Sequence, residues 1–272
     1  MSKMKLLFTD LDATFLDDNK NVPEPNHLAV QEMLEQGHKV IIATGRSLSS
    51  ALLQAERLQL DRQGCYCIAY NGGQIYDFGT EKLIYHKTVP VRCAKEAYRI
   101  CKKYGVHIHT YDATYVLTPE ENESVKKYCS LVHVPYKVIS GLFEQLDFEP
   151  SKVLMSDFDK TGILKTVQRE VDAACKGETD TFFSCEEYLE MVRHGVSKGA
   201  AVQFLCEYLN VDLKDTVACG DAENDIPMIE TAGVGVCMCN GDTKVKEKAD
   251  YITTRNNNEG GVAEAIQKFI LK

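Results

Sequence analysis

The sequence lacks any apolar run long enough to cross a membrane. A transmembrane helix needs about 20 consecutive apolar residues, and no stretch of the chain approaches that length. The opening segment, MSKMKLLFTDLD, contains basic residues, but its apolar part is too short for a secretory signal. We therefore expect a cytoplasmic protein with no membrane partner.

An excess of positive charge is also missing. The formal net charge of −9 argues against nucleic acid or an anionic membrane surface as the main partner, because both attract basic proteins. An anionic substrate would have to be attracted by a local site that combines a bound cation with a few basic side chains. The contents of 44% hydrophobic and 26% charged residues are those of an ordinary globular protein.

Cysteine pairs of the Cys-x-x-Cys type are absent, although the chain contains 11 cysteines. Such pairs mark many zinc sites. Cys65 and Cys67, and likewise Cys237 and Cys239, lie two positions apart in apolar runs, so each pair would face one side of a strand. We expect reduced, buried thiols that pack as small hydrophobic groups.

Short apolar runs alternate with helical patterns in the first and last thirds of the chain. Ser47 is expected to cap the helix that follows it, and Asn224 or Asp225 to cap the helix near the last strands. This alternation predicts an α/β fold with a doubly wound parallel sheet, a Rossmann-like core covered on both faces. The expected strands are 5–10, 39–44, 67–70, 215–221, 234–238 and 251–253, and the expected helices are 26–37, 47–60, 197–209, 224–232 and 259–271.

The middle third of the chain shows a different order of predicted strands and helices. After a predicted hairpin at 75–87, strands and helices mix without the regular alternation of the flanking regions. We predict a separate α+β domain over 88–191, inserted into a core built from 1–87 and 192–272. In an open parallel sheet the ligand binds at the carboxyl ends of the strands, so the site is expected at that edge of the core.

Four polar segments end apolar runs or open helices. They are Asp10-Leu11-Asp12-Ala13-Thr14, Ala43-Thr44-Gly45-Arg46, Ser197-Lys198-Gly199 and Gly220-Asp221-Ala222-Glu223-Asn224-Asp225. Each alone is an ordinary turn, helix cap or surface lysine, but three of the four follow core strands and would meet at one edge. The paired carboxylates of Asp10 and Asp12 repel each other, which indicates that a cation binds between such groups.

The order and wording of these segments resemble the haloacid dehalogenase superfamily of phosphotransferases, which carries DxDx[TV], a strand-end Ser or Thr, a Lys, and GDxxxD. The short spacing from SKGAA to GDAENDIPM, and the insert between the second and third motifs, resemble the Cof-like phosphatases with the large, type II cap. One position departs from the family pattern, because Ala13 stands where glycine is usual. We expect this change to be tolerated, since the added methyl is costly only at positive φ.

The resemblance implies a Mg²⁺ cofactor held by oxygen ligands. Asp10 would supply a carboxylate oxygen, Asp12 its backbone carbonyl and Asp221 a second carboxylate, with Asp225 orienting this shell from behind. The resemblance also makes Asp10 the nucleophile that forms an aspartyl-phosphate, and Asp12 the general acid and base. The implied phosphate-binding groups are the side chains of Thr44, Lys198 and Asn224 and the backbone N–H groups of Leu11 and Gly45.

The expected activity is a Mg²⁺-dependent hydrolysis of small phosphomonoesters, with sugar phosphates as one candidate class. Two alternatives stay open: a phosphosugar mutase that uses the same two aspartates, and a phosphate-binding regulatory protein that has lost catalysis. The inserted domain is expected to close over the phosphate and exclude water. The expected partner is a small phosphorylated metabolite, and the chain would act as a monomer or a small homo-oligomer.

Overall fold

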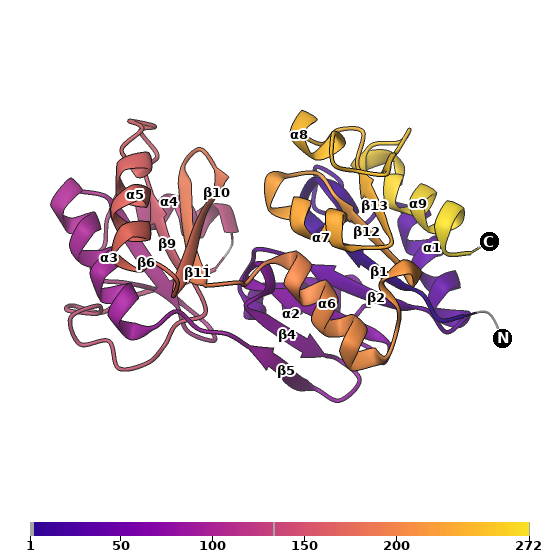
Figure 1. The fold of residues 1–272 in the computed structure, drawn as a ribbon, viewed down its shortest axis with the longest axis horizontal. Coiled ribbons are helices and arrows are strands. Elements are labelled where there is room, and N and C mark those ends of the chain that lie inside the picture. The colour runs from indigo at the N-terminus through magenta and orange to yellow at the C-terminus, as the bar shows by residue number, and fades with distance from the viewer. Residues whose placement is uncertain (1–2, 133, 272) are drawn as a thin grey trace. The chain divides into compact units, whose positions relative to one another are not determined.

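The computed structural model describes residues 3–132 and 134–271. The chain divides into two compact units, Met1–Tyr85 with Ser197–Lys272, and His86–Val196 (Figure 1). The segment 88–191 that the sequence marked as an insert therefore lies inside the second unit. Among the described residues, no helix has the length and apolar character needed to span a bilayer.

The first unit is built on an eight-stranded sheet in the order β14-β13-β12-β1-β2-β3-β4-β5. Its six strands from β14 to β3 are parallel, and β4 pairs with β3 in the antiparallel sense. The predicted α/β fold with a parallel sheet is confirmed. The strands are β1 (Leu6–Thr9), β2 (Lys39–Ala43), β3 (Cys65–Ala69), β4 (Gln74–Asp77), β5 (Lys82–His86), β12 (Thr216–Gly220), β13 (Val234–Cys237) and β14 (Tyr251–Ile252).

Strand β1 lies between β2 and β12, where the order of strands along the sheet reverses. Leu6 pairs with Lys39 of β2 on one side and with Thr216 of β12 on the other. Such a reversal is the point at which doubly wound sheets bind their ligands, because the flanking helices leave in opposite directions. All four residues of β1 are buried, which explains its continuous apolar sequence.

Helices cover both faces of this sheet. Along β1 the side chains alternate, so Leu7 joins one apolar cluster while Leu6 and Phe8 join the other. Helices α1 (Glu24–Glu35), α2 (Leu48–Arg57) and α9 (Gly261–Phe269) pack in the first cluster, and α6 (Lys198–Leu209) and α7 (Ile226–Thr231) in the second; α8 spans Thr243–Lys246. Figure 1 shows the orange helices α6 and α7 in the same unit as the indigo strands β1 and β2.

The helix caps were predicted with mixed success. Ser47 does cap α2, since its hydroxyl accepts from the backbone N–H of Ser50, and Ser197 caps α6 through Ala200. For α7 the predicted cap position was confirmed, but a capping bond was not found. Asp225 occupies the cap position of that helix, but its side chain makes no capping bond and is used elsewhere.

The second unit contains a six-stranded sheet in the order β10-β11-β9-β6-β7-β8. Helices α3 (Val91–Tyr104) and α5 (Leu164–Ala174) cover one face through an apolar cluster that includes Ile108, Met155 and Met191. Helix α4 (Glu123–Val132) completes the unit. The strands are β6 (His107–Tyr111), β7 (Val116–Thr118), β8 (Tyr136–Val138), β9 (Val153–Ser156), β10 (Thr179–Cys185) and β11 (Tyr188–Arg193).

The opposite face of β6 carries a buried polar row. His107 Nε2 lies 3.1 Å from His109 Nδ1, and His109 Nε2 lies 3.1 Å from the hydroxyl of Tyr111. That hydroxyl lies 2.7 Å from the hydroxyl of Tyr128 in α4. Burial lowers the pKa of His107 to about 4 and that of His109 well below its ordinary value. Both imidazoles are therefore neutral at pH 7 and act as structural hydrogen-bonding groups.

Candidate active site

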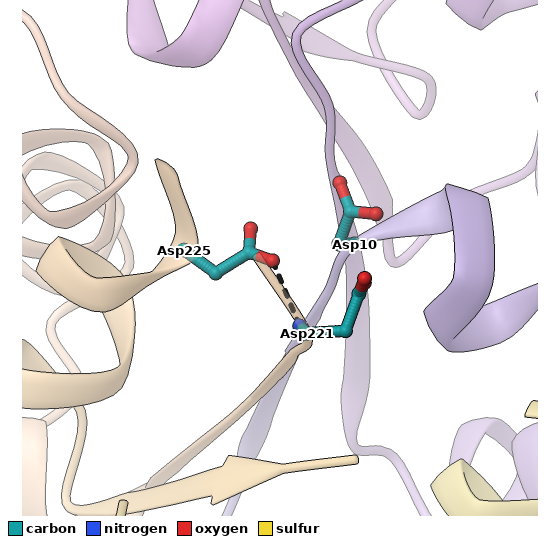
Figure 2. A group of neighbouring side chains, drawn as sticks. All are labelled: Asp10, Asp221 and Asp225. Carbon is teal, nitrogen blue, oxygen red and sulfur yellow. Dashed lines mark hydrogen bonds between the residues drawn. The ribbon is translucent and has the colours of Figure 1, made fainter. Parts of the chain in front are cut away.

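Three carboxylates gather at the carboxyl edge of the parallel sheet of the first unit. Asp10 follows β1, Asp221 follows β12, and Asp225 lies one turn beyond Asp221. One oxygen from each carboxylate lies within 4.8 Å of the other two, and Figure 2 shows the three side chains converging. The neighbourhood of Asp10 and Asp221 follows directly from the pairing of β1 with β12.

This cluster contains more carboxylates than positively charged groups. Burial raises the pKa of Asp10 to about 8, and the charges of Asp225 and Asp221 add to the rise although Lys198 opposes it. Burial also raises the pKa of Asp221 to about 6. Carboxyl groups resist ionisation when they lack water and sufficient positive charge. The donor set is entirely oxygen, and its shortage of positive charge fits a hard divalent cation such as Mg²⁺.

Lys198 is the cation inside the cluster. Its side chain is fully buried, and Nζ donates to Asp10 Oδ1 at 2.6 Å and to Asp225 Oδ1 at 2.5 Å. Burial lowers the pKa of Lys198, but the charges of Asp10 and Asp225 outweigh this effect and raise the pKa above its ordinary value. The ammonium group is therefore charged, and among the described residues it is the cation in contact with this cluster.

Asp225 braces the loop that carries Asp221. Its Oδ2 accepts from the backbone N–H groups of Asp221 at 2.9 Å and Ala222 at 3.1 Å, and Figure 2 marks the first of these bonds. Gly220 permits this close approach, since a Cβ at that position would lie 2.4 Å from the Cβ of Asp225. Asp221 is held from the other side by Thr14, whose hydroxyl donates to Oδ1 at 2.5 Å.

The side chain of Asp12 has different partners. Arg46 donates to it through Nε at 2.9 Å and Nη2 at 2.7 Å, and Lys20 Nζ donates at 2.7 Å. Burial raises the pKa of Asp12, but Arg46 and Lys20 together lower it below its ordinary value. The carboxylate is therefore ionised and fixed in direction. Sequence reasoning assigned no role to Lys20, which has no motif around it, and it quoted Arg46 only as part of a segment.

Ala13 adopts a left-handed conformation with φ of 59°. The expectation that alanine is tolerated here assumed a negative φ, and that assumption was wrong. A non-glycine residue in this region costs roughly 1–2 kcal/mol, because Cβ approaches the following carbonyl oxygen. The strained residue lies directly between Asp12 and Thr14, and its carbonyl accepts from Asn240 Nδ2 at 2.8 Å.

The predicted phosphate-binding residues fall into two groups. Lys198 lies inside the carboxylate cluster, and the buried Leu11 follows Asp10 directly in the loop after β1. Thr44, Gly45 and Asn224 are instead linked through Asn71, a residue that sequence reasoning missed. Asn224 Nδ2 donates to Asn71 Oδ1 at 3.1 Å, and the backbone N–H of Asn71 donates to the carbonyl of Thr44 at 3.0 Å. The NGG turn after the third strand was the available signal.

Comparisons with known proteins agree with this geometry. Residues 7–266 match the model of a family described as haloacid dehalogenase-like hydrolase. The chain is 34% identical to the putative phosphatase M6_Spy0533 of Streptococcus pyogenes, over 98% of this chain and 99% of the relative. It is 28% identical to the 5-amino-6-(5-phospho-D-ribitylamino)uracil phosphatase YcsE of Bacillus subtilis, over 98% of this chain and 96% of the relative.

A solved structure supports the same family assignment. A haloacid dehalogenase-like hydrolase from Bacteroides thetaiotaomicron superposes with a TM-score of 0.88 at 29% identity, covering 98% of this chain and 99% of the other. The family predicted from the order of the four motifs is thereby confirmed. The chain belongs to the haloacid dehalogenase-like hydrolases.

Proposed function

We propose that this protein is a Mg²⁺-dependent phosphatase that hydrolyses small phosphomonoesters through a phosphorylated aspartate. The observation that carries the proposal is the cluster of Asp10, Asp221 and Asp225 beside the buried ammonium group of Lys198. Such a cluster is short of positive charge, and a cation together with a phosphate is the combination that it can bind and use.

The residues that would hold Mg²⁺ follow from the contacts of the cluster. Asp225 has both oxygens engaged by Lys198 and by backbone N–H groups, so it orients its neighbours. The carboxylates of Asp10 and Asp221 remain as the ligands that we propose, and the family resemblance adds the backbone carbonyl of Asp12. Bound there, the ion would neutralise charge on the phosphoryl group and on the nucleophile.

Asp10 is the proposed nucleophile. One of its carboxylate oxygens attacks phosphorus, the bond from phosphorus to the ester oxygen breaks, and the leaving alcohol takes a proton. Lys198 supports this role because its bond to Oδ1 of Asp10 leaves the other oxygen for the attack. Water then attacks the phosphorylated aspartate, releasing inorganic phosphate and restoring the carboxylate.

Asp12 is the proposed acid and base of the two steps. Arg46 and Lys20 hold its carboxylate ionised, which is the form that removes a proton from the attacking water. In the first step Asp12 would give a proton to the leaving alcohol, and the phosphate charge nearby makes protonation easier than in the free site. The fork of Arg46 fixes the direction in which the carboxylate presents its oxygens.

Thr44, Lys198 and Asn224 are the proposed side-chain donors to the phosphate, with the backbone N–H groups of Leu11 and Gly45. Positioning and charge stabilisation account for most of the catalysis of phosphoryl transfer. Sugar phosphates remain one candidate substrate class. A similar protein, YcsE, is named for a substrate with a phosphorylated ribityl chain, which supports a phosphorylated polyol among the compounds to be screened.

The test is a phosphate-release assay on p-nitrophenyl phosphate and a panel of sugar phosphates. Activity should disappear in EDTA and return with Mg²⁺, whereas Ca²⁺ should inhibit because its larger and looser ligand shell spoils the geometry of attack. Full activity in the chelator would contradict the proposal. Discharge of phosphorylated Asp10 by a sugar monophosphate rather than by water would indicate a mutase, and absence of both turnover and label would indicate a binding protein.

A further inference from the structure

The turn after β3 is the most strained backbone segment near the site. Tyr70, Asn71 and Gly72 have successive positive φ values of 51°, 55° and 108°. Two non-glycine residues in the left-handed region each cost of order 1 kcal/mol or more, so such a turn persists only where its surroundings fix it. Tyr70 and Asn71 are both almost completely buried. None of the four motifs includes this turn.

The turn contacts three of the loops that surround the carboxylate cluster. The backbone N–H groups of Tyr70 and Asn71 donate to the carbonyls of Arg46 at 2.9 Å and Thr44 at 3.0 Å. Gly72 lies against the residue that precedes Lys198, since a Cβ there would stand 2.3 Å from the carbonyl oxygen of Ser197. The turn therefore lies between the loop after β2 and the start of α6 and contacts both.

The side chain of Asn71 contacts the third loop, which carries Asn224. Its Oδ1 accepts from Asn224 Nδ2 at 3.1 Å. The same side chain packs against Gly45, where a Cβ would lie 3.0 Å from Oδ1 and 3.1 Å from Nδ2. Glycine at position 45 thus makes room for Asn71, and Asn71 joins two segments that lie far apart in the chain.

We propose that Asn71 is a positioning residue that orients Asn224 and the backbone of Gly45 toward the substrate phosphate; this rests on the proposed function. A carboxamide is planar and has two N–H donors. When Asn71 accepts from one of them, the direction of the other is fixed. Without Asn71, Asn224 rotates freely and loses order before it can donate, which weakens phosphate binding.

The experiment is a double-mutant cycle on binding of inorganic phosphate to the full-length, Mg²⁺-loaded protein, measured by titration calorimetry. Asn71→Gly keeps the left-handed backbone accessible and removes only the carboxamide. We expect Asn71→Gly and Asn224→Ala each to weaken phosphate binding about tenfold to a hundredfold, the size of one hydrogen bond to a charged group. The double variant should be no weaker than Asn224→Ala alone, because the two residues act as one unit.

A matched control comes from Asn210, an exposed asparagine at the end of α6 with φ of 53°. Asn210→Gly makes the same chemical change at the same backbone conformation and should leave phosphate affinity unchanged. Additive losses in the double variant, or equal losses in Asn210→Gly, would overturn the positioning role. So would a wild-type protein that binds no phosphate.

The positioning role and the proposed function fail in different ways. A wild type that binds phosphate but releases none from any phosphomonoester contradicts the phosphatase, while the cycle on phosphate binding still decides the role of Asn71. An active wild type with additive losses contradicts the role of Asn71 and leaves the phosphatase intact.

Discussion

Among the described residues two lysines are buried, one in each unit, and their surroundings differ. Lys152 of the second unit pairs with Glu190 at 2.9 Å and lies over the ring of Tyr111. Lys198 of the first unit is shared by Asp10 and Asp225, with Asp221 beside them. The first arrangement is balanced, one charge against one. The second has more negative charge than one lysine can offset.

This difference in charge balance distinguishes a structural ion pair from a candidate binding site. A balanced buried pair satisfies itself, so it needs no ligand and its loss harms the fold. A cluster with an excess of negative charge has perturbed pKa values, as Asp10 and Asp221 show, and such groups mark a candidate binding site. The same residue type thus occurs in a one-to-one ion pair in the second unit and in the proposed active site in the first.

The largest expected effects come from replacing the carboxylate beside each buried lysine, Asp10 beside Lys198 and Glu190 beside Lys152. Asp10→Asn should lower turnover at least a thousandfold, while the free energy of unfolding of the metal-free protein should change little, because burial raises the pKa of Asp10 to about 8 and the carboxyl then carries little charge at pH 7. Glu190→Gln should cost about 3–5 kcal/mol of stability, because it removes the carboxylate that lies 2.9 Å from the buried ammonium group of Lys152. Urea unfolding curves of both variants measure the free energy of unfolding. Phosphate release, assayed under conditions in which each variant is folded, measures turnover.

The two variants should change different quantities: Asp10→Asn should change turnover, and Glu190→Gln should change the free energy of unfolding. Near-normal turnover in Asp10→Asn would remove the nucleophile from the mechanism. An unfolding free energy unchanged in Glu190→Gln would show that the balanced pair does not stabilise the second unit. Asp112→Asn, in an exposed turn of the second unit, is a control that should change neither quantity.

A smaller effect, counted per histidine and per pH unit, is expected from pH on the buried histidines of the second unit. The folded pKa values of His107 and His109 are depressed by burial, and the charges beside His109 are Lys152 and His107. The stability that the neutral rings provide is therefore complete above pH 6.5 and is lost as pH falls toward 4. Each histidine should contribute a slope of about 1.4 kcal/mol per pH unit in that interval.

His109→Gln tests this slope without changing the charge at pH 7. The glutamine can still bond to its neighbours, so the variant should unfold with one proton fewer taken up between pH 6.5 and 4. Urea titrations at several pH values measure the difference. A wild-type slope retained in His109→Gln would show that this ring does not titrate on unfolding, and the polar row would then need another explanation.

The smallest expected effect concerns the strained loop of the first unit. Ala13→Gly should raise the free energy of unfolding by about 0.5–1 kcal/mol, because glycine adopts positive φ without a Cβ clash. Gln59→Gly, at an exposed residue with φ of 56°, should give a similar gain away from the site. Equilibrium unfolding in urea measures both. A loss of stability in Ala13→Gly alone would mean that the methyl group contributes packing that outweighs the strain.

Local patterns were enough to predict the parallel sheet and the carboxylate cluster. The continuous apolar run before Asp10 and the acid-ended run before Asp221 carry their own strand signal, and parallel strands place their carboxyl ends together. The positive φ of Ala13, the contact of Lys20 with Asp12 and the bond from Asn224 to Asn71 depend on segments that meet only in the folded chain. Strand β8 was missed because it is three residues long and mostly exposed.

The separation of Asp10 and Lys198 by 188 positions has a consequence for biosynthesis. Strand β1 can pair with β2 early, but β12, its other neighbour, is made only after the whole second unit. At about 5–20 residues per second, the ribosome needs roughly 10–40 s to cover that distance. During this interval one long edge of β1 lacks its partner, so the nascent chain carries an open, apolar strand that can pair with other chains. Completing the carboxylate cluster and closing this edge are therefore the same late event.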